Sequence, residues 1–440
     1  MENTRSVQTP ALDQTPRIVI VGNSATAVGA VEALRKVDQS AEVTVISAEP
    51  HMIYSRPMLS HYLAGEIERP RLAYRGADFY ARHNVRPVLD DAVVRIDPQA
   101  HSVTTASGQT FGWDKLLIAT GGSPIIPPLP GLDVEGVYAF TRLDDALAIL
   151  EYARKREARH AVVIGGGMIG IKATDALLKR GLRISMVELA PAILARSLDE
   201  VASRMMSNLL VDAGVEVLLE NTVTEVRSSE GRLTGVVLRD GRQIACDLLV
   251  FGIGVRPNAG LAREAGLKVN QGIVVDHAMR TSHEGIYAAG DVAEAYDLVV
   301  DMNRIVAIWP NAYRQGATAG AHMVGVERVD PGGVAMNTVE VCGVPAISVG
   351  NGNAPEEGHQ VLAECDERAH RYKRMVLRDG RLVGVILVGD INRAGVYTGL
   401  IRNRIDVSGC EDALLNERIS LLSLPDQYRK HVVTGAGIEV

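Results

Sequence analysis

An internal repeat constrains this chain more than any other feature of its sequence. Residues 17–50 begin with the apolar run RIVIV, pass through the turn GNSA into a helical pattern, and close on a second strand and an acid. Residues 160–191 repeat this order, from the run HAVVI through the turn GGGMIG to a second acid. Each copy predicts a strand, a glycine turn, a helix and a parallel strand, with the strands buried on both faces.

The turns and the closing acids are the positions where a nucleotide binds such a unit. Unpaired N–H groups at the start of the helix attract a pyrophosphate, and small residues let it approach. The acids Glu49 and Glu188 follow about 20–27 residues beyond the first glycine, where a carboxylate accepts the hydroxyls of a ribose. The predicted turn residues are Gly22, Ser24, Ala25 and Ala27 in the first copy and Gly165, Gly167, Ile169 and Gly170 in the second.

The two copies differ in how well they match the dinucleotide fingerprint. The second reads G-x-G-x-x-G in full, whereas the first has Ser24 and Ala27 at the second and third positions. Glu188 is expected to repel the 2′-phosphate of NADP, and the following Leu189 and Ala190 supply no arginine to hold one. The second copy therefore predicts a site that prefers NAD.

Composition narrows the class of protein. The 440 residues predict about three domains. Aromatic residues make up 4%, and 46 Lys+Arg stand against 53 Asp+Glu, so we expect no nucleic-acid partner. The four cysteines, Cys246, Cys342, Cys365 and Cys410, form no local metal or disulfide motif. We expect a disordered tail over residues 1–16, no membrane span and a cytoplasmic protein.

Further motifs carry a resemblance to a known family. They are Ala119-Thr120-Gly121 at the end of an apolar strand, the segment GIGVRPN that contains Gly254, and the segment TSHEGIYAAGD that ends in Asp291. With the two glycine turns, they make the chain resemble the FAD-dependent pyridine nucleotide-disulfide oxidoreductase superfamily from Arg17 to about Gly325. The resemblance implies FAD on the first turn and NAD on the second.

The resemblance also implies an architecture and further cofactor contacts. The fold is an α/β protein with two Rossmann-like dinucleotide-binding domains and a C-terminal α+β domain. FAD is expected on residues 17–128 and 256–325, NAD on the inserted residues 129–255, and subunit contacts on residues 326–440. By resemblance, Asp291 binds the ribityl and phosphate region of FAD, and Trp309 opens a helix that faces the flavin. Arg56 is expected to contact FAD or the nicotinamide pocket.

The chain departs from its thiol-dependent relatives. Pro57 stands where single-cysteine relatives have their cysteine, so no thiol relay is expected. The segment RPMLSH instead resembles ferredoxin, rubredoxin and nitrite reductases, which have a lysine at His61 and a glutamate at Lys172; in those relatives the two side chains pair beside the flavin. We expect Lys172 to supply positive charge near the flavin and His61 to hydrogen-bond its edge. The alternative is that both are solvated surface groups.

These features predict an oxidoreductase that exchanges hydride with NAD(H) and single electrons with an iron-sulfur carrier protein. The resemblance extends to NAD-linked flavoprotein subunits of 2-oxoacid:acceptor oxidoreductases such as phenylglyoxylate dehydrogenase, and it leaves a homodimer and a hetero-complex open. A stand-alone rubredoxin or ferredoxin reductase and an NADH oxidase stay as alternatives. A non-catalytic flavoprotein that senses NAD is a further one.

Overall fold

The first sheet gathers strands from distant parts of the chain. The computed structural model describes residues 15–416. Five parallel strands lie in the order β19-β7-β1-β2-β3. Their bounds are β1 (Arg17–Val21), β2 (Glu42–Ile46), β3 (Val85–Val88), β7 (Lys115–Ile118) and β19 (Ile286–Ala288). Ile18 and Val19 point to opposite faces of β1 and are both buried, as expected for a strand covered on both faces. Pro16, assigned to the tail from the sequence, already accepts a hydrogen bond from the Glu42 N–H at 2.9 Å.

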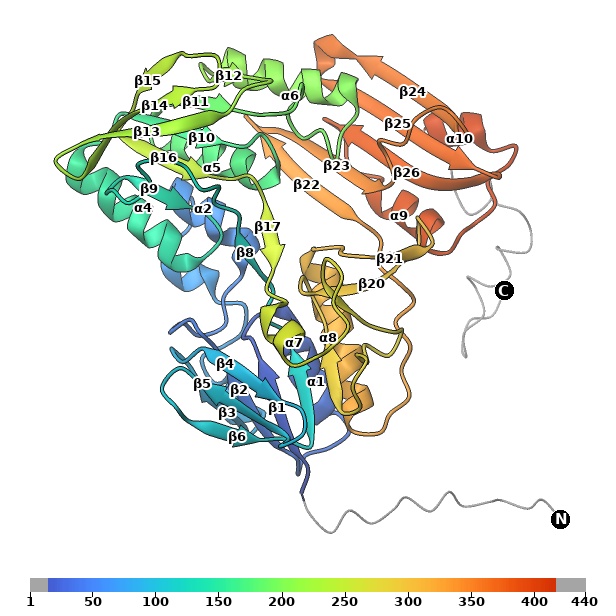
Figure 1. Ribbon diagram of the computed structural model, residues 1–440. Helices are drawn as coiled ribbons and strands as arrows, with labels where there is room; N and C mark the ends of the chain where they lie inside the picture. Colours follow the sequence, from blue (N-terminus) through green and yellow to red (C-terminus); the bar gives the residue numbers. More distant parts are fainter. Residues whose placement is uncertain (1–14, 417–440) are drawn as a thin grey trace.

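Two helices from opposite ends of this region cover the first sheet in direct backbone contact. Helix α1 (Ala25–Arg35) follows the first glycine turn, and α8 (Trp309–Met323) lies beside it (Figure 1). A Cβ atom at Gly29 would lie 2.1 Å from the Tyr313 carbonyl oxygen, and one at Gly316 would lie 2.1 Å from that of Thr26. Only glycine allows the two helices to approach this closely.

Smaller elements surround the first sheet. Two three-stranded sheets flank it: β4 (Val93–Asp97), β5 (Ser102–Thr105) and β6 (Thr110–Gly112) form one, and β18 (Ile273–Val274), β20 (Ala293–Asp297) and β21 (Met302–Arg304) form the other. The short helices here are α3 (Phe79–Arg82) and α7 (Gly260–Glu264), whereas α2 (Leu59–Ala64) buries Leu59 and Leu63 in the core of the second sheet, described below. They leave the carboxyl ends of the parallel strands uncovered, where ligands bind in folds of this type.

The second sheet repeats the first. Its parallel strands lie in the order β12-β11-β10-β16-β9. Their bounds are β9 (Val137–Ala139), β10 (His160–Ile164), β11 (Arg183–Val187), β12 (Glu216–Leu218) and β16 (Leu248–Phe251). Its helices are α4 (Leu143–Arg156), α5 (Met168–Lys179) and α6 (Glu200–Asp212), and a sheet of β13 (Val223–Ser229), β14 (Arg232–Leu238) and β15 (Gln243–Ala245) flanks it. Both copies of the repeat thus form the predicted parallel unit.

The two connections between these halves run together. Strand β8 (Gly122–Pro124) leaves the first half and pairs antiparallel with β17 (Val255–Pro257), which returns from the second. The Thr120 hydroxyl donates to the Asn258 carbonyl oxygen at 3.0 Å, and the Asn258 amide donates to the Thr120 carbonyl oxygen at 2.9 Å. The second half is therefore an insertion joined through one two-stranded ribbon.

A third, antiparallel sheet forms the C-terminal part, in the order β22-β23-β26-β25-β24. Its elements are β22 (Met336–Val341), β23 (Val344–Gly350), β24 (Gln360–Asp366), β25 (Arg371–Arg378), β26 (Arg381–Val388), α9 (Ala394–Arg402) and α10 (Glu411–Leu415). Val339, Val341 and Tyr372 share a core with the second sheet. Residues 1–14 of the expected tail and 417–440 of the expected C-terminal domain lie outside the described residues.

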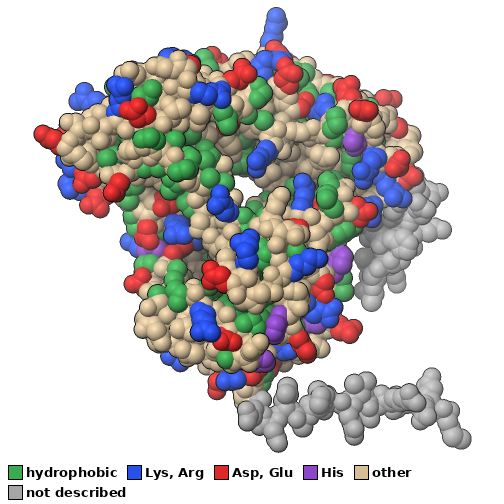
Figure 2. Space-filling model, in the orientation of Figure 1, with side chains coloured by type: hydrophobic (Ala, Val, Ile, Leu, Met, Phe, Trp, Pro, Cys, Tyr) green, Lys and Arg blue, Asp and Glu red, His purple; other side chains and the backbone are tan. Residues whose placement is uncertain are grey.

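Figure 2 shows a hollow in the surface between the part of the molecule that contains the second and third sheets and the part that contains the first sheet. Lys and Arg side chains lie around this hollow. Within residues 15–416, no helix is both long and apolar enough to cross a membrane. The same residues contain no cluster of three or more His, Cys, Asp or Glu side chains that could hold a metal ion.

Candidate functional site

A cavity of about 720 Å³ lies where the carboxyl ends of the two parallel sheets meet. The first sheet contributes the residues that follow β1, β2, β7 and β19, and the second contributes those that follow β9 and β10. Of the residues expected to bind a cofactor, those that line the cavity are Gly22, Ser24, Ala25, Glu49, Arg56, Ala119, Thr120, Gly121, Ile169, Asp291 and Trp309. Both halves of the repeat thus face one space.

The first glycine turn forms the floor of this cavity. Gly22 has a φ of +121°, and a Cβ atom there would lie 2.1 Å from the Ala119 carbonyl oxygen. Ser24 is the N-cap of α1, but its side chain makes no capping hydrogen bond. The N–H groups of the first helical turn are therefore available to an anionic ligand. Ala27 is buried in α1, at 2% exposure, and does not line the cavity.

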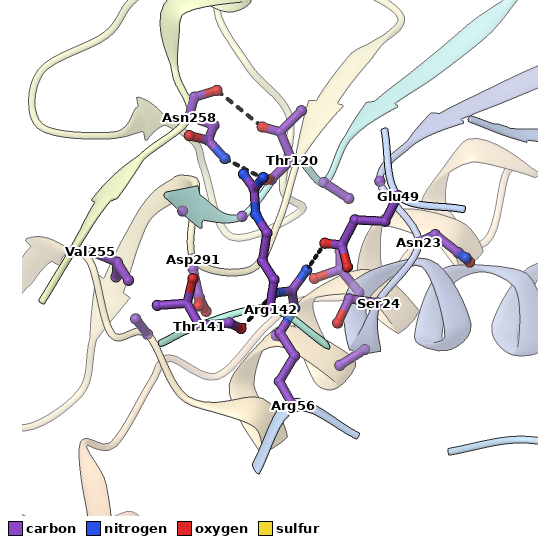
Figure 3. A pocket seen from close by; sticks show the side chains of 18 of the residues that line it. Asn23, Ser24, Glu49, Arg56, Thr120, Thr141, Arg142, Val255, Asn258 and Asp291 are labelled. Atoms are coloured by element: carbon purple, nitrogen blue, oxygen red, sulfur yellow. Dashed lines mark hydrogen bonds and ion pairs between the residues drawn. The ribbon is translucent and has the colours of Figure 1, made fainter. Parts of the chain in front are cut away.

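The acid that closes the first copy is held by two donors. Glu49 accepts a hydrogen bond from Tyr54 Oη at 2.6 Å and forms an ion pair with Arg56 Nη2 at 2.5 Å. Arg56 also donates to the Thr141 carbonyl oxygen at 2.9 Å (Figure 3). Burial raises the pKa of Tyr54, so the phenol stays protonated and donates to the carboxylate. This network ties the end of β2 to the segment that follows β9.

Asp291 lies across the cavity from this network and has no hydrogen bond or ion pair among the residues the structure describes. Burial raises the pKa of its carboxyl, and the positive charge of Arg56 opposes that shift. The neighbouring Gly290 N–H donates to the Gln315 side chain at 2.9 Å, which fixes the turn that carries the aspartate. A buried carboxyl group without a partner is costly, and a ligand hydroxyl would satisfy it.

Trp309 and the Ala119–Gly121 segment complete the walls on the first-sheet side. Trp309 begins α8 and packs edge-on against Tyr74, with ring centroids 5.0 Å apart. Gly121 has a φ of +63°, which suits glycine at this turn. Gly254, with a φ of +115°, lies just outside the cavity, and its neighbour Val255 lines it.

The second glycine turn is also built for close approach. A Cβ atom at Gly170 would lie 1.7 Å from the Gly165 carbonyl oxygen, and Gly167 is the N-cap of α5. The Glu188 carboxylate accepts hydrogen bonds from the N–H groups of Gly166 and Ala190. None of Gly165, Gly167, Gly170 and Glu188 lines the cavity. The turn instead leads into it through Met168 and Ile169.

The two residues expected to act in catalysis have different surroundings. His61 lies on α2, is exposed and does not line the cavity; its Nδ1 lies 2.5 Å from Glu66 Oε2. Glu66 follows the end of α2 and is also held by Lys179, which draws the imidazole toward the surface. Of the two residues, only Lys172 lines the cavity, although their helices α2 and α5 pack against each other.

Lys172 lies one turn beyond Ile169 on α5. Its side chain has no hydrogen bond or ion pair among residues 15–416, and burial lowers its pKa. Arg142 is a cavity residue that sequence reasoning missed. It occupies the N-cap of α4, where Ser, Thr, Asp or Asn is favoured. An arginine at an N-cap is the signal that could have drawn attention to it.

Known families match nearly the whole described chain. Residues 16–316 match the family described as pyridine nucleotide-disulphide oxidoreductase, and residues 336–405 match the rubredoxin NAD+ reductase C-terminal domain. The chain belongs to the pyridine nucleotide-disulphide oxidoreductase family. It is an NAD(H)-dependent flavin oxidoreductase of the branch without a redox-active cysteine near the first turn, and it uses FAD and NAD(H).

Two relatives with described activities are similar to most of this chain. The chain is 34% identical over 398 residues to a nitrite reductase [NAD(P)H] of Bacillus subtilis, covering 89% of this chain and 48% of the relative. It is 33% identical over 397 residues to the epsilon subunit of the NADH-dependent phenylglyoxylate dehydrogenase of Aromatoleum evansii, covering 89% and 93%. The chain thus spans about half the length of the first relative and nearly all of the second.

Solved structures agree with this family assignment. A ferredoxin reductase from Rhodopseudomonas palustris superposes with a TM-score of 0.78 at 27% identity, covering 85% of this chain and 91% of that one. A putidaredoxin reductase solved in covalent complex with putidaredoxin gives a TM-score of 0.81 at 25% identity, covering 91% and 98%. The α/β architecture with two dinucleotide-binding units and a C-terminal domain is therefore confirmed.

Proposed function

We propose that this chain passes electrons between NAD(H) and an iron-sulfur protein, as the NAD-linked flavoprotein subunit of a larger dehydrogenase complex. One observation carries this proposal. The cavity receives both nucleotide units, and none of its lining residues in the described chain is a cysteine. Pro57 lines it where a thiol would otherwise stand, and burial raises the pKa of the remote Cys246 thiol to about 12. A flavin here has no sulfur to reduce, which favours an external electron partner.

The chain's own residues divide the work of binding. Gly22 and the start of α1 would hold the FAD pyrophosphate, Glu49 its adenosine ribose and Asp291 its ribityl chain. The second turn and Glu188 would hold NAD, with Leu189 and Ala190 giving no support to a 2′-phosphate. Bound FAD supplies the chemistry that converts a two-electron hydride into single electrons. Phe140, Ile169 and Val255 line the cavity and exclude water from the hydride path.

The relatives support the complex-subunit form of this proposal. The relative that this chain covers to 93% of its length is a subunit of an NADH-dependent dehydrogenase. Within residues 15–416, no cluster of three or more His, Cys, Asp or Glu side chains could hold a metal centre. Tagged protein isolated from its source is expected to bring iron-sulfur subunits with it. Isolation as a lone protein that reduces a small carrier would overturn the subunit assignment.

A second candidate is a stand-alone rubredoxin or ferredoxin reductase. The match of residues 336–405 to a rubredoxin reductase C-terminal domain favours it. Anaerobic mixing of the FAD-loaded protein with NADH separates the candidates. Reduction of the flavin followed by rapid transfer to rubredoxin would support the reductase, and transfer only to copurified subunits would support the complex. Fast steady-state oxygen consumption would point to an NADH oxidase, and absence of flavin reduction to a non-catalytic sensor.

A further inference from the structure

The charges that line the cavity are unevenly distributed. Its charged side chains are Glu49, Arg56, Arg142, Lys172 and Asp291. Glu49 and Asp291 both come from the first-sheet side, and Arg56 is the cation placed among them. It pairs with Glu49, and its charge acts on Asp291. On the first-sheet side, the positive charge of Arg56 is therefore balanced by carboxylates.

The second-sheet side presents cations alone. Arg142 stands at the start of α4, and its Nη2 lies 3.3 Å from the Ser123 hydroxyl. Lys172 projects from α5. Neither forms an ion pair with a carboxylate within residues 15–416. Figure 3 shows Arg142 extending into the cavity from the same segment as Thr141. Burial lowers the pKa of Lys172, as expected for a cation shielded from water without an acid beside it.

The order of the strands indicates where the nicotinamide end of a bound dinucleotide would meet these two cations. Carboxyl ends of parallel strands share one edge, so Glu188 after β11, the turn after β10 and Arg142 after β9 follow one another along it. The ribose acid, Glu188, lies outside the cavity, on the side of the turn away from Arg142. From the turn, α5 leads through Ile169 to Lys172 inside the cavity. The nicotinamide must enter there to reach the flavin, a step that rests on the proposed function.

We propose that Arg142 and Lys172 make this cavity discriminate between the two redox forms of the nucleotide, binding NADH more tightly than NAD+. The nicotinamide ring carries a positive charge in NAD+ and none in NADH, and the two nucleotides share the same adenosine and pyrophosphate. Attraction to the pyrophosphate therefore cancels in the comparison, whereas repulsion of the ring acts on NAD+ only. The two residues set specificity without taking part in the hydride step.

Equilibrium binding to the oxidised, FAD-loaded protein tests this proposal. The probes are NAD+ and 1,4,5,6-tetrahydro-NAD, a neutral dinucleotide that does not donate hydride, with the flavin absorbance change as the readout. We expect the wild-type protein to bind the neutral probe more tightly. Lys172→Met is expected to tighten NAD+ binding by about tenfold, equivalent to about 1.4 kcal/mol, with the neutral probe changed less than about twofold. Lys172→Arg should keep the wild-type ratio.

Each cation has a matched control on its own helix. Lys179 ends α5 and pairs with Glu66 and Asp175, and Arg156 ends α4 and pairs with Glu135. Lys179→Met and Arg156→Gln should leave the ratio of the two dissociation constants unchanged. Arg142→Gln should lower this ratio in the same direction as Lys172→Met, and it provides an independent measurement if the lysine variant loses FAD.

Two results would overturn the inference. Equal weakening of both probes in Lys172→Met and Arg142→Gln would place these cations on the pyrophosphate, and an unchanged ratio would show that neither senses the ring. The proposed function fails separately. A protein that keeps the ratio but reduces no iron-sulfur partner loses that function and keeps the discrimination, and the reverse result loses only the discrimination.

Discussion

The two nucleotide units differ in a way their motifs do not suggest. The second turn matches the glycine fingerprint in full, yet its turn glycines and Glu188 lie outside the cavity. The first turn departs from the fingerprint at Ser24 and Ala27 but lies at the floor of the cavity. The first turn is enclosed by α8 and by the turn after β19, and both of these elements are far from it in the sequence. The match to the glycine fingerprint thus indicates the local geometry of a turn. The packing of distant elements decides how far that turn is enclosed in the cavity.

The largest effect is expected when the close packing of α1 and α8 is disrupted. Gly316→Ala places a Cβ atom 2.1 Å from the Thr26 carbonyl oxygen, so the helices must separate. We expect a loss of about 1–3 kcal/mol in the free energy of unfolding and loss of bound FAD. Denaturant titration and the flavin absorbance of purified protein measure the two effects. Gly395→Ala, in α9 with open space around it, is the control and should change neither.

The next test concerns the unpartnered acid of the first unit. Asp291→Asn removes a charge that has no hydrogen bond in the described chain and whose desolvation outweighs the attraction of Arg56, so the protein without FAD should be as stable as wild type or more so. FAD binding should weaken by about 1.5–3 kcal/mol, because a charge-assisted hydrogen bond to the cofactor is lost. Calorimetric titration of FAD into the apoprotein and thermal unfolding give the two values. Weaker FAD binding together with a less stable apoprotein would contradict the binding role.

Nucleotide binding to the second unit should be lost without loss of FAD from the first. Gly170→Ala would bring a Cβ atom 1.7 Å from the Gly165 carbonyl oxygen and distort the turn that leads into α5. We expect affinity for the tetrahydro-NAD probe to fall at least about tenfold while the FAD content stays at the wild-type level. Loss of FAD in this variant would show that the two units are coupled, through the ribbon of β8 and β17 or through the packing of α2 on α5.

The smallest effect is a pH dependence within the first unit. Glu32 of α1 accepts from Arg75 Nε at 2.7 Å and from Tyr313 Oη of α8 at 2.7 Å. The Arg75 hydrogen bond holds the pKa of Glu32 below its usual range. Since the folded protein favours the charged form, this stability is present above the unfolded pKa and is lost as pH falls through the lower, folded value.

Glu32→Gln should therefore cost about 0.5–1.5 kcal/mol at neutral pH, and the difference from wild type should shrink in acid. Denaturant titrations across the acid range measure it. Asp78→Asn breaks an exposed pair with Arg82 and is the matched control, with little change expected. A cost for Glu32→Gln that persists unchanged in acid would contradict the ionic origin of this contribution.

Much of the site could be predicted because its parts are local. A glycine turn, the helix that follows and the acid that closes the unit lie within one stretch of chain, so their spacing reports their geometry. The positions of Gly22 and Glu49 were predicted in this way, whereas that of Asp291 was expected from the family resemblance. The position of His61 was not predicted, because it depends on Glu66 and Lys179, and no spacing rule reports which acid captures an imidazole. Arg142 was missed because its position at the cavity depends on where β9 joins the second sheet, beside β16.

The sequence alone determined that there are two strand-turn-helix units and that no cysteine lies near the first turn, and it predicts NAD on the second turn. These properties follow from the order of residues along short segments, where backbone geometry leaves few choices. Only the tertiary structure decided that both units open on one cavity, that α1 and α8 touch through glycines, and that Arg142 and Lys172 line this cavity without forming an ion pair in the described chain. Such properties depend on contacts between residues far apart in the chain, and many arrangements of the same local units would satisfy the sequence pattern.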